Sequence, residues 1–171
     1  MATNFEKLIH DRYSVRKFKS APIEKDKLDK ILEAARIAPT ARNSQSQRIK
    51  IVDTKSDLAL IDECTPYRWG APLVLIVCYD KSLAWHNKHY PEITASETDA
   101  AIAVTQMIYM AWDLGLVSCW VQHFDPIKCA ELFKIPKNLV PITLLPIGYA
   151  SDDCKTSPNH GVRNPLSDFL F

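Results

Sequence analysis

The run Leu73-Val74-Leu75-Ile76-Val77-Cys78-Tyr79 is apolar along its whole length. Successive side chains of a β-strand point to opposite faces of its sheet, so a strand of this kind needs apolar cover on both faces. We therefore predict a central strand over 73–79, with helices packed on both sides of the sheet.

Two amphipathic helices are predicted before this strand. Residues 4–11 place apolar side chains at helical spacing after a candidate cap at Thr3 or Asn4. Residues 24–37 carry one apolar and one charged face, and Pro39 follows as a stop. The first helix ends where an arginine-rich segment begins.

Residues 97–114 form the longest predicted helix, with Gly115 as its cap, and its side chains leave almost no polar face. We expect such a helix to be buried on most sides. A small domain has limited surface with which to cover it. A homodimer, in which a second copy covers part of the helix, is therefore a hypothesis from packing alone.

Shorter elements complete the pattern. The further predicted elements are strands over 48–53, 117–121 and 142–149, a short helix over 125–133, and a polar, aromatic-rich loop or lid over 80–96. Pro146 interrupts the last strand, and since proline has no N–H to donate, an edge position or a bulge is expected there.

Composition limits the class of protein. The chain has 171 residues, 47% apolar and 24% charged, which predicts one globular domain over 1–171. The 21 basic and 20 acidic residues supply no basic field, so neither nucleic acid nor an anionic membrane is an expected partner. With no signal-like or membrane-spanning run, a cytoplasmic protein is expected.

Cysteine and histidine spacing gives no support for a metal site. The five cysteines are scattered without a C-x-x-C pair, which favours reduced, mostly buried thiols. His86 and His89 are spaced as metal ligands could be, but no carboxylate or thiol accompanies them at a recognised spacing. No metal is expected.

The four glycines are too far apart to form a glycine-rich phosphate loop. If a phosphate is bound, side chains must bind it. Arg12, Ser14 and Arg16 offer two guanidiniums and a hydroxyl within one short segment. From spacing alone, a solvated basic run that continues through Lys17 and Lys19 explains the segment slightly better.

Residues 39–47 concentrate hydroxyl and amide side chains directly after an apolar helix. Amides can donate and accept at the edge of a polar heterocycle, although such clusters are most often simple loops. By pattern alone, Trp112 and Trp120 are more typical of core residues than of a cofactor wall, and Cys119 of a small buried residue than of a nucleophile.

These segments, in this order, resemble the FMN-dependent nitroreductase family over 8–166. Arg12-Tyr13-Ser14-Val15-Arg16-Lys17-Phe18 looks like the family's R-x-S-x-R-x-F, and Ala38-Pro39-Thr40-Ala41-Arg42-Asn43-Ser44-Gln45 is similar to its A-P-S-x-x-N-x-Q. The resemblance implies an α+β fold, a three-layer α-β-α sandwich with a mixed, mostly antiparallel sheet. It also implies an intertwined homodimer with FMN at the subunit interface.

The resemblance also implies which residues bind FMN. Arg12, Tyr13, Ser14 and Arg16 are assigned to the phosphate, the ribityl chain and the N1/O2 side of the ring, and Pro39, Thr40, Ala41 and Asn43 reach the flavin from the partner subunit. Trp120 and Val121 lie along the ring, and Arg163 returns to the phosphate, where His160 is a candidate to assist. No catalytic side chain is required, because the flavin itself carries the hydride.

The implied function is an NAD(P)H oxidoreductase that reduces nitroaromatic, quinone or similar electron-poor acceptors by ping-pong hydride transfer through flavin N5. Ser46 and Gln47 stand where the family commonly has proline and tryptophan, and Gln122 where glycine is frequent, which suggests an altered substrate face. The alternatives are a non-enzymatic FMN-binding or dimeric interaction protein, and a sister flavin reaction such as reductive dehalogenation.

Overall fold

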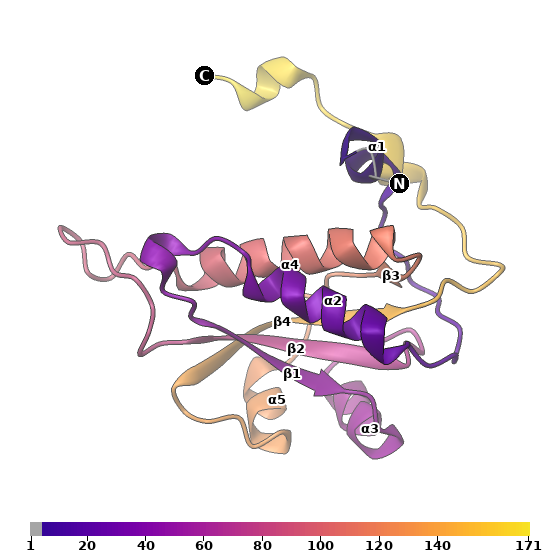
Figure 1. The fold of residues 1–171 in the computed structure, drawn as a ribbon, viewed down its shortest axis with the longest axis horizontal. Helices are drawn as coiled ribbons and strands as arrows, with labels where there is room; N and C mark the ends of the chain where they lie inside the picture. The colour runs from indigo at the N-terminus through magenta and orange to yellow at the C-terminus, as the bar shows by residue number, and fades with distance from the viewer. Residues whose placement is uncertain (1–4) are drawn as a thin grey trace.

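The computed structural model describes residues 5–171 and has three layers (Figure 1). The helices α2 and α4 cover one face of a four-stranded sheet, and α3 and α5 cover the other. The α-helices and strands are α1 (Phe5–Asp11), α2 (Lys25–Arg36), β1 (Gln47–Val52), α3 (Lys55–Cys64), β2 (Leu73–Asp80), α4 (Ser96–Asp113), β3 (Val117–Ser118), α5 (Pro126–Leu132) and β4 (Leu139–Gly148). The predicted α-β-α sandwich is confirmed; the candidate caps Thr3 and Asn4 lie outside the described residues.

The apolar run forms β2, an inner strand of the sheet order β1-β2-β4-β3. Leu75 and Val77 pack in the core shared with α2 and α4, whereas Val74 and Ile76 pack in the core shared with α3 and α5. All three strand pairs are antiparallel, as the mostly antiparallel prediction requires. The run is therefore covered on both faces.

Pro146 does not mark an edge strand, because β4 lies between β2 and β3. The register irregularity of β4 is opposite Val77 and Cys78, away from Pro146, so the predicted bulge there is also wrong. The Pro146 carbonyl accepts from the Cys119 N–H at 3.3 Å, so the backbone polar groups of Pro146 face the β3 side. Since β3 already ends at Ser118, proline removes no strand hydrogen bond.

The helix α4 is buried along one stripe, which includes Ala103, Val104 and Met107. Its other apolar side chains, such as Ile102 and Met110, are only partly buried. The expectation that the helix is buried on most sides is therefore wrong for the single chain, which buries one side of it. The remaining side is available to a second copy.

The sequence prediction missed α3, because its apolar pattern covers only a few residues. Thr54 caps the helix by accepting the Asp57 N–H at 3.2 Å, and Leu58 and Ile61 follow at helical spacing. The predicted strand over 117–121 was too long, because β3 spans two residues and Val121 forms only an isolated bridge to Leu144.

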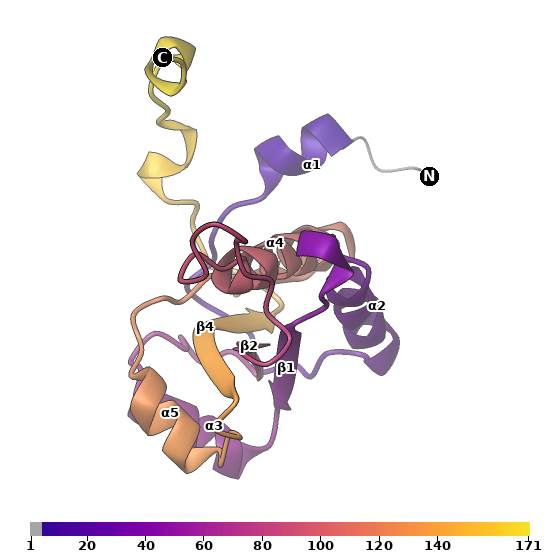
Figure 2. The same ribbon diagram turned by 90° about the vertical axis from the view of Figure 1, so that its left-hand side faces the viewer.

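Two segments extend from the sandwich. Figures 1 and 2 show α1 and the C-terminal segment standing off its α4 side. The His160 ring Nε2 lies 3.1 Å from the His10 carbonyl and joins the two segments. Beyond it, Leu166, Phe169 and Leu170 are exposed, although they are apolar. The C-terminal segment therefore has an apolar surface that its own chain leaves uncovered.

The end of α5 provides a test of the fold's local energetics. Lys134 has a φ of 50°, and the N–H groups of Lys134 and Ile135 donate to the Glu131 and Ala130 carbonyls, the pattern of a Schellman cap. Because glycine adopts this conformation without strain, Lys134→Gly should raise the free energy of unfolding by about 0.5–1 kcal/mol in urea denaturation. Lys134→Ala, which keeps the strain, should give no such gain; equal effects of the two changes would contradict the prediction.

Candidate functional site

The arginine-rich segment is attached to the sheet beside β3. The Val15 N–H donates to the Ser118 carbonyl at 3.1 Å, and Phe18 forms an isolated bridge with Ala150. Val15 is fully buried, so the side chains of Ser14 and Arg16 on either side of it point away from the core. The backbone of the segment is thereby fixed between the edge of the sheet and α4.

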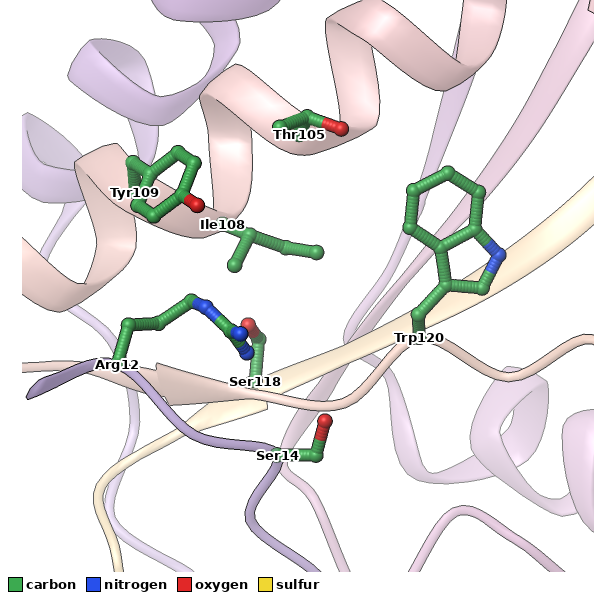
Figure 3. A pocket seen from close by; sticks show the side chains of 7 residues that line it. All are labelled: Arg12, Ser14, Thr105, Ile108, Tyr109, Ser118 and Trp120. Carbon is green, nitrogen blue, oxygen red and sulfur yellow. The ribbon is translucent and has the colours of Figure 1, made fainter. Parts of the chain in front are cut away.

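A cavity of about 200 Å³ opens between this segment, α4 and the chain after β3 (Figure 3). It is lined by Arg12, Ser14, Thr105, Ile108, Tyr109, Ser118 and Trp120. The Arg12 guanidinium lies over the Tyr109 ring, 5.9 Å from its centroid, which orients it. A guanidinium with several hydroxyls suits a phosphate, and an aromatic side wall suits a planar ring.

Trp120 forms the wall of the cavity opposite Arg12 (Figure 3). Its indole Nε1–H donates to Gln122 Oε1 at 3.0 Å, which restrains the ring. Val121 is buried and does not line the cavity. Trp120 is partly buried and packs against the core shared with α2 and α4, as its pattern suggested, and it also lines the cavity, as the resemblance implies.

Other predicted residues of the segment lie around the cavity without lining it. Tyr13 packs between Trp112 and His160, at ring-centroid distances of 5.2 and 5.7 Å. The Arg16 guanidinium lies 5.8 Å from the Trp69 ring centroid and is exposed. Arg163 is exposed as well and donates to the Val162 carbonyl. Tyr13 therefore has a packing contact, and both arginines have solvent-exposed side chains.

The residues Pro39, Thr40, Ala41 and Asn43 do not line the cavity of their own chain. They form a loop beside the N-terminal end of α4, whereas the arginine segment passes the other end of this helix (Figure 1). Within one chain, the two groups of residues that the resemblance assigns to one site therefore lie at opposite ends of α4. The implied contribution of this loop from a partner subunit stays a prediction.

The backbone of this loop is unusual. Arg42, Asn43 and Gln45 have φ values of 54°, 57° and 49°. A left-handed conformation costs a residue with a side chain about 1–2 kcal/mol. Asp99 on α4 offsets this cost: its carboxylate accepts the Ala41 N–H at 2.9 Å and the Ser44 hydroxyl at 3.1 Å. Hydrogen bonds to a charged group contribute about 1.5–3 kcal/mol each.

Ser46 and Gln47 do not form an exposed face together. Ser46 is fully buried, and its hydroxyl has no hydrogen-bond partner among the described residues. Gln47 is half-buried, and its Nε2 donates to the Ala35 carbonyl at 3.2 Å. The prediction that Ser46 alters a substrate-facing surface is therefore wrong.

Thr105, Ile108 and Tyr109 line the cavity but were not predicted. Thr105, Ile108 and Tyr109 are spaced so that they share one face of α4. That spacing is the signal in the sequence, but it marks a face of a helix without indicating what the face contacts. Ser118 also lines the cavity; it begins the segment Ser118-Cys119-Trp120-Val121, which the resemblance implies along the flavin ring.

Burial raises the pKa of the Cys119 thiol, although Arg16, Ser14 and Arg12 beside it act in the opposite direction. Burial also raises the pKa of Cys78 to about 11 and that of Cys129 to about 12. Cys154 is the only cysteine of the described chain that is partly exposed. The buried thiols are thus poor nucleophiles.

Labelling the native protein with a thiol reagent at about pH 8 should therefore modify Cys154 and leave the four buried cysteines unreacted. Mass spectrometry of the labelled protein measures this result. Cys154→Ser should abolish rapid labelling, and the unfolded wild-type chain should react at all five positions. Rapid modification of native Cys119 would show that the cavity region is more open than described.

Neither a metal-binding cluster nor a membrane-spanning helix is found in the described part of the chain. No group of three or more histidine, cysteine or acidic side chains within residues 5–171 is arranged to hold a metal ion. The His86 ring Nδ1 lies 2.7 Å from the Pro91 carbonyl, inside the loop that precedes α4. Over the same residues, no helix is both long and apolar enough to span a membrane.

The fold is a three-layer α+β sandwich, and a cavity beside α4 carries one guanidinium and aromatic walls. This combination defines the class of a small α+β protein with a site for a phosphate-bearing, planar ligand. The chain belongs to the nitroreductase family, whose model matches residues 9–68 and 65–149. It is 35% identical to a nitroreductase family protein of Clostridium difficile 630, with a TM-score of 0.92 over 99% of this chain and 98% of that one.

Two further relatives carry functional names. An FMN-dependent nitroreductase of Clostridium difficile R20291 is 27% identical, with a TM-score of 0.75 over 93% of this chain and 98% of that one. An FMN reductase (NAD(P)H) of Bacillus subtilis is 27% identical over 169 residues, which cover 89% of this chain and 68% of the relative.

Proposed function

We propose that the protein is an FMN-dependent NAD(P)H oxidoreductase of the nitroreductase type. The observation that carries this proposal is the cavity that combines the Arg12 guanidinium, the Ser14 and Ser118 hydroxyls and the Trp120 indole. This donor set fits a phosphate joined to a planar ring. The names of the FMN-dependent and NAD(P)H-linked relatives support the same cofactors.

In the proposed site, Arg12 binds the phosphate with its guanidinium, which Tyr109 orients. Ser14 and Ser118 would donate hydroxyl hydrogen bonds to FMN. The Trp120 indole, which Gln122 restrains, would limit access to the flavin ring from its side of the cavity. Bound FMN supplies the chemistry by accepting hydride from NAD(P)H and passing it to an acceptor. The positive charge of Arg16, which acts on neighbouring Cys119, would favour negative charge on the reduced ring.

The proposal includes a homodimer. The cavity of about 200 Å³ is smaller than the roughly 300–1,000 Å³ of most ligand pockets, so one chain supplies only part of a site for FMN. A second, largely apolar cleft of about 370 Å³ opens between α1, α2 and α4, lined by residues that include Phe5, Ile37 and Met110. With the exposed C-terminal segment, this cleft gives a second copy a surface around which to intertwine.

Light scattering coupled to size exclusion tests the dimer. The expected mass is twice the 19.4 kDa of one chain. In such a dimer, the loop over residues 39–43 of one copy would complete the cavity of the other. A stable monomer at micromolar concentration would contradict both statements.

The proposed acceptors are electron-poor compounds such as nitroaromatics and quinones, because these would accept the hydride that bound FMN would supply. The alternative of a non-enzymatic flavoprotein was based on an altered substrate face at Ser46 and Gln47. Because Ser46 is buried, it does not alter that face. The Trp120 wall and the loop over residues 81–95 are the elements expected to select among acceptors.

An anaerobic titration tests the function. The protein loaded with FMN should be yellow, NADH or NADPH should bleach it, and a quinone or nitroaromatic compound should restore the colour. A yellow protein that neither nicotinamide bleaches would overturn the reductase assignment. A protein that does not bind added FMN would overturn the flavin site as well.

A further inference from the structure

The loop that carries the amide side chains, residues 40–45, is held in its conformation by hydrogen bonds from within the loop and from its neighbours. Within the loop, the Thr40 hydroxyl accepts the Gln45 N–H at 3.1 Å, and the Thr40 carbonyl accepts the Asn43 N–H at 2.9 Å. The side chains of Arg42, Asn43 and Gln45 are exposed. From outside the loop, Arg48 Nη1 donates to the Gln45 carbonyl at 2.8 Å.

Asp99 supplies further support from the first turn of α4, where it holds the middle of the loop. The side chain is 2% exposed, although it is a carboxylate. Its two oxygens are used separately, Oδ1 by the Ala41 N–H and Oδ2 by the Ser44 hydroxyl. Among the described residues, no lysine, arginine or histidine forms an ion pair with Asp99 within 4.0 Å. The buried Asp99 carboxylate is therefore stabilised by its hydrogen bonds to the loop and not by an ion pair.

A buried carboxylate without a cationic partner is costly unless its hydrogen bonds are satisfied. Burial and loop conformation are therefore coupled: the loop supplies donors to Asp99, and Asp99 fixes the loop against the end of α4. The carboxylate also lies near the helix N-terminus, where negative charge is favoured. An aliphatic residue at this position could pack, but it could not hold Ala41 and Ser44.

We infer that Asp99 is a positioning residue for the FMN site, which fixes the amide loop that one subunit contributes to the cavity of the other. This inference rests on the proposed function, because it assigns the loop to a flavin site. Asp99 touches neither cofactor nor substrate in this role. It acts through the backbone of Ala41 and the hydroxyl of Ser44.

The test compares four variants. Asp99→Ala removes both hydrogen bonds, Ser44→Ala removes one of them without changing the helix, and Asp99→Asn keeps an amide oxygen that can accept the Ala41 N–H. Glu97→Ala is the matched control, because it removes an exposed carboxylate from the same helical turn. Circular dichroism and thermal unfolding of each variant show whether it is folded.

The first measurement is hydrogen exchange of residues 40–45 in the FMN-free protein. Exchange in this segment should be about tenfold faster in Asp99→Ala, less increased in Ser44→Ala and Asp99→Asn, and unchanged in Glu97→Ala. The second measurement is the Kd of FMN, which should rise about tenfold in Asp99→Ala and recover partly in Asp99→Asn. The flavin absorption spectrum should change in the same order of variants.

Wild-type exchange and wild-type FMN affinity in folded Asp99→Ala would overturn the inference. If Asp99→Ala does not fold, Ser44→Ala decides, and wild-type values for that variant overturn it. A wild-type protein that does not bind FMN refutes the proposed function and, with it, the role of the loop in a flavin site. Exchange in the FMN-free protein would then still show whether Asp99 fixes the loop.

Discussion

Replacing Arg12 by alanine is expected to weaken FMN binding about 10- to 100-fold, the equivalent of the 1.5–3 kcal/mol of one hydrogen-bonded charged group. Arg12 is the only guanidinium that lines the cavity of the described chain. Because riboflavin lacks the phosphate, its affinity should change little. Titration of flavin fluorescence with wild-type and variant protein measures both values.

Two variants control this experiment. Arg12→Lys keeps the charge but loses the forked donor geometry, so its FMN affinity should lie between those of wild type and Arg12→Ala. Lys128→Ala removes a partly exposed cation that pairs with Glu63 on α3, on the face of the sheet opposite α4, and should leave FMN affinity unchanged. An equal loss of FMN and riboflavin affinity in Arg12→Ala would show that Arg12 does not bind the phosphate.

The Gly148→Ala substitution is expected to lower the free energy of unfolding by about 1–3 kcal/mol, as overpacking of a filled site does. A Cβ atom at this position would lie 2.9 Å from Pro72 Cδ and 3.2 Å from Phe18 Cδ1. The Pro72 ring cannot rotate away, so Phe18 or the strand must shift. Urea denaturation measures the loss of stability.

The same substitution should also weaken FMN binding, because Phe18 belongs to the segment that carries Arg12. Gly161→Ala is the matched control, since a Cβ there would meet no atom within 4 Å. Its effect on stability should stay within about 0.5 kcal/mol. A Gly148→Ala protein as stable as Gly161→Ala would contradict the close packing of β4 against Phe18 and Pro72.

The elements that the sequence predicted correctly are those with a strong periodic signal. The apolar run of β2 required cover on both faces, and the apolar faces of α2 and α4 supplied part of this cover. The Asp125-Pro126 start of α5 was also correct, since the Asp125 carboxylate accepts the Ile127 and Lys128 N–H groups. In each case the physical cause is local to the chain.

The errors arise where distant segments decide the structure. Pro146 is compatible with an inner strand only because β3 ends before reaching it. The helix α3 is short, and its small apolar face was not recognised. Periodicity reports which side chains are apolar, but it does not report which strands become neighbours.

The same distinction applies to the site. Arg12 and Ser14 lie in one short motif, and the structure brings both to the cavity. Tyr13 looked equivalent to them in the motif, but its side chain packs against Trp112. Tyr109 belongs to the cavity because α4 passes over the arginine segment, and no local pattern predicts that contact.

A crystal structure of the protein with bound FMN tests the central claim most directly. The phosphate is expected within about 2.7–3.2 Å of the Arg12 guanidinium nitrogens and near Ser14, with the ring beside Trp120. Residues 39–43 of a second copy should lie against the same flavin. FMN bound elsewhere, for example in the groove of about 570 Å³ beside α5, would contradict the proposed site.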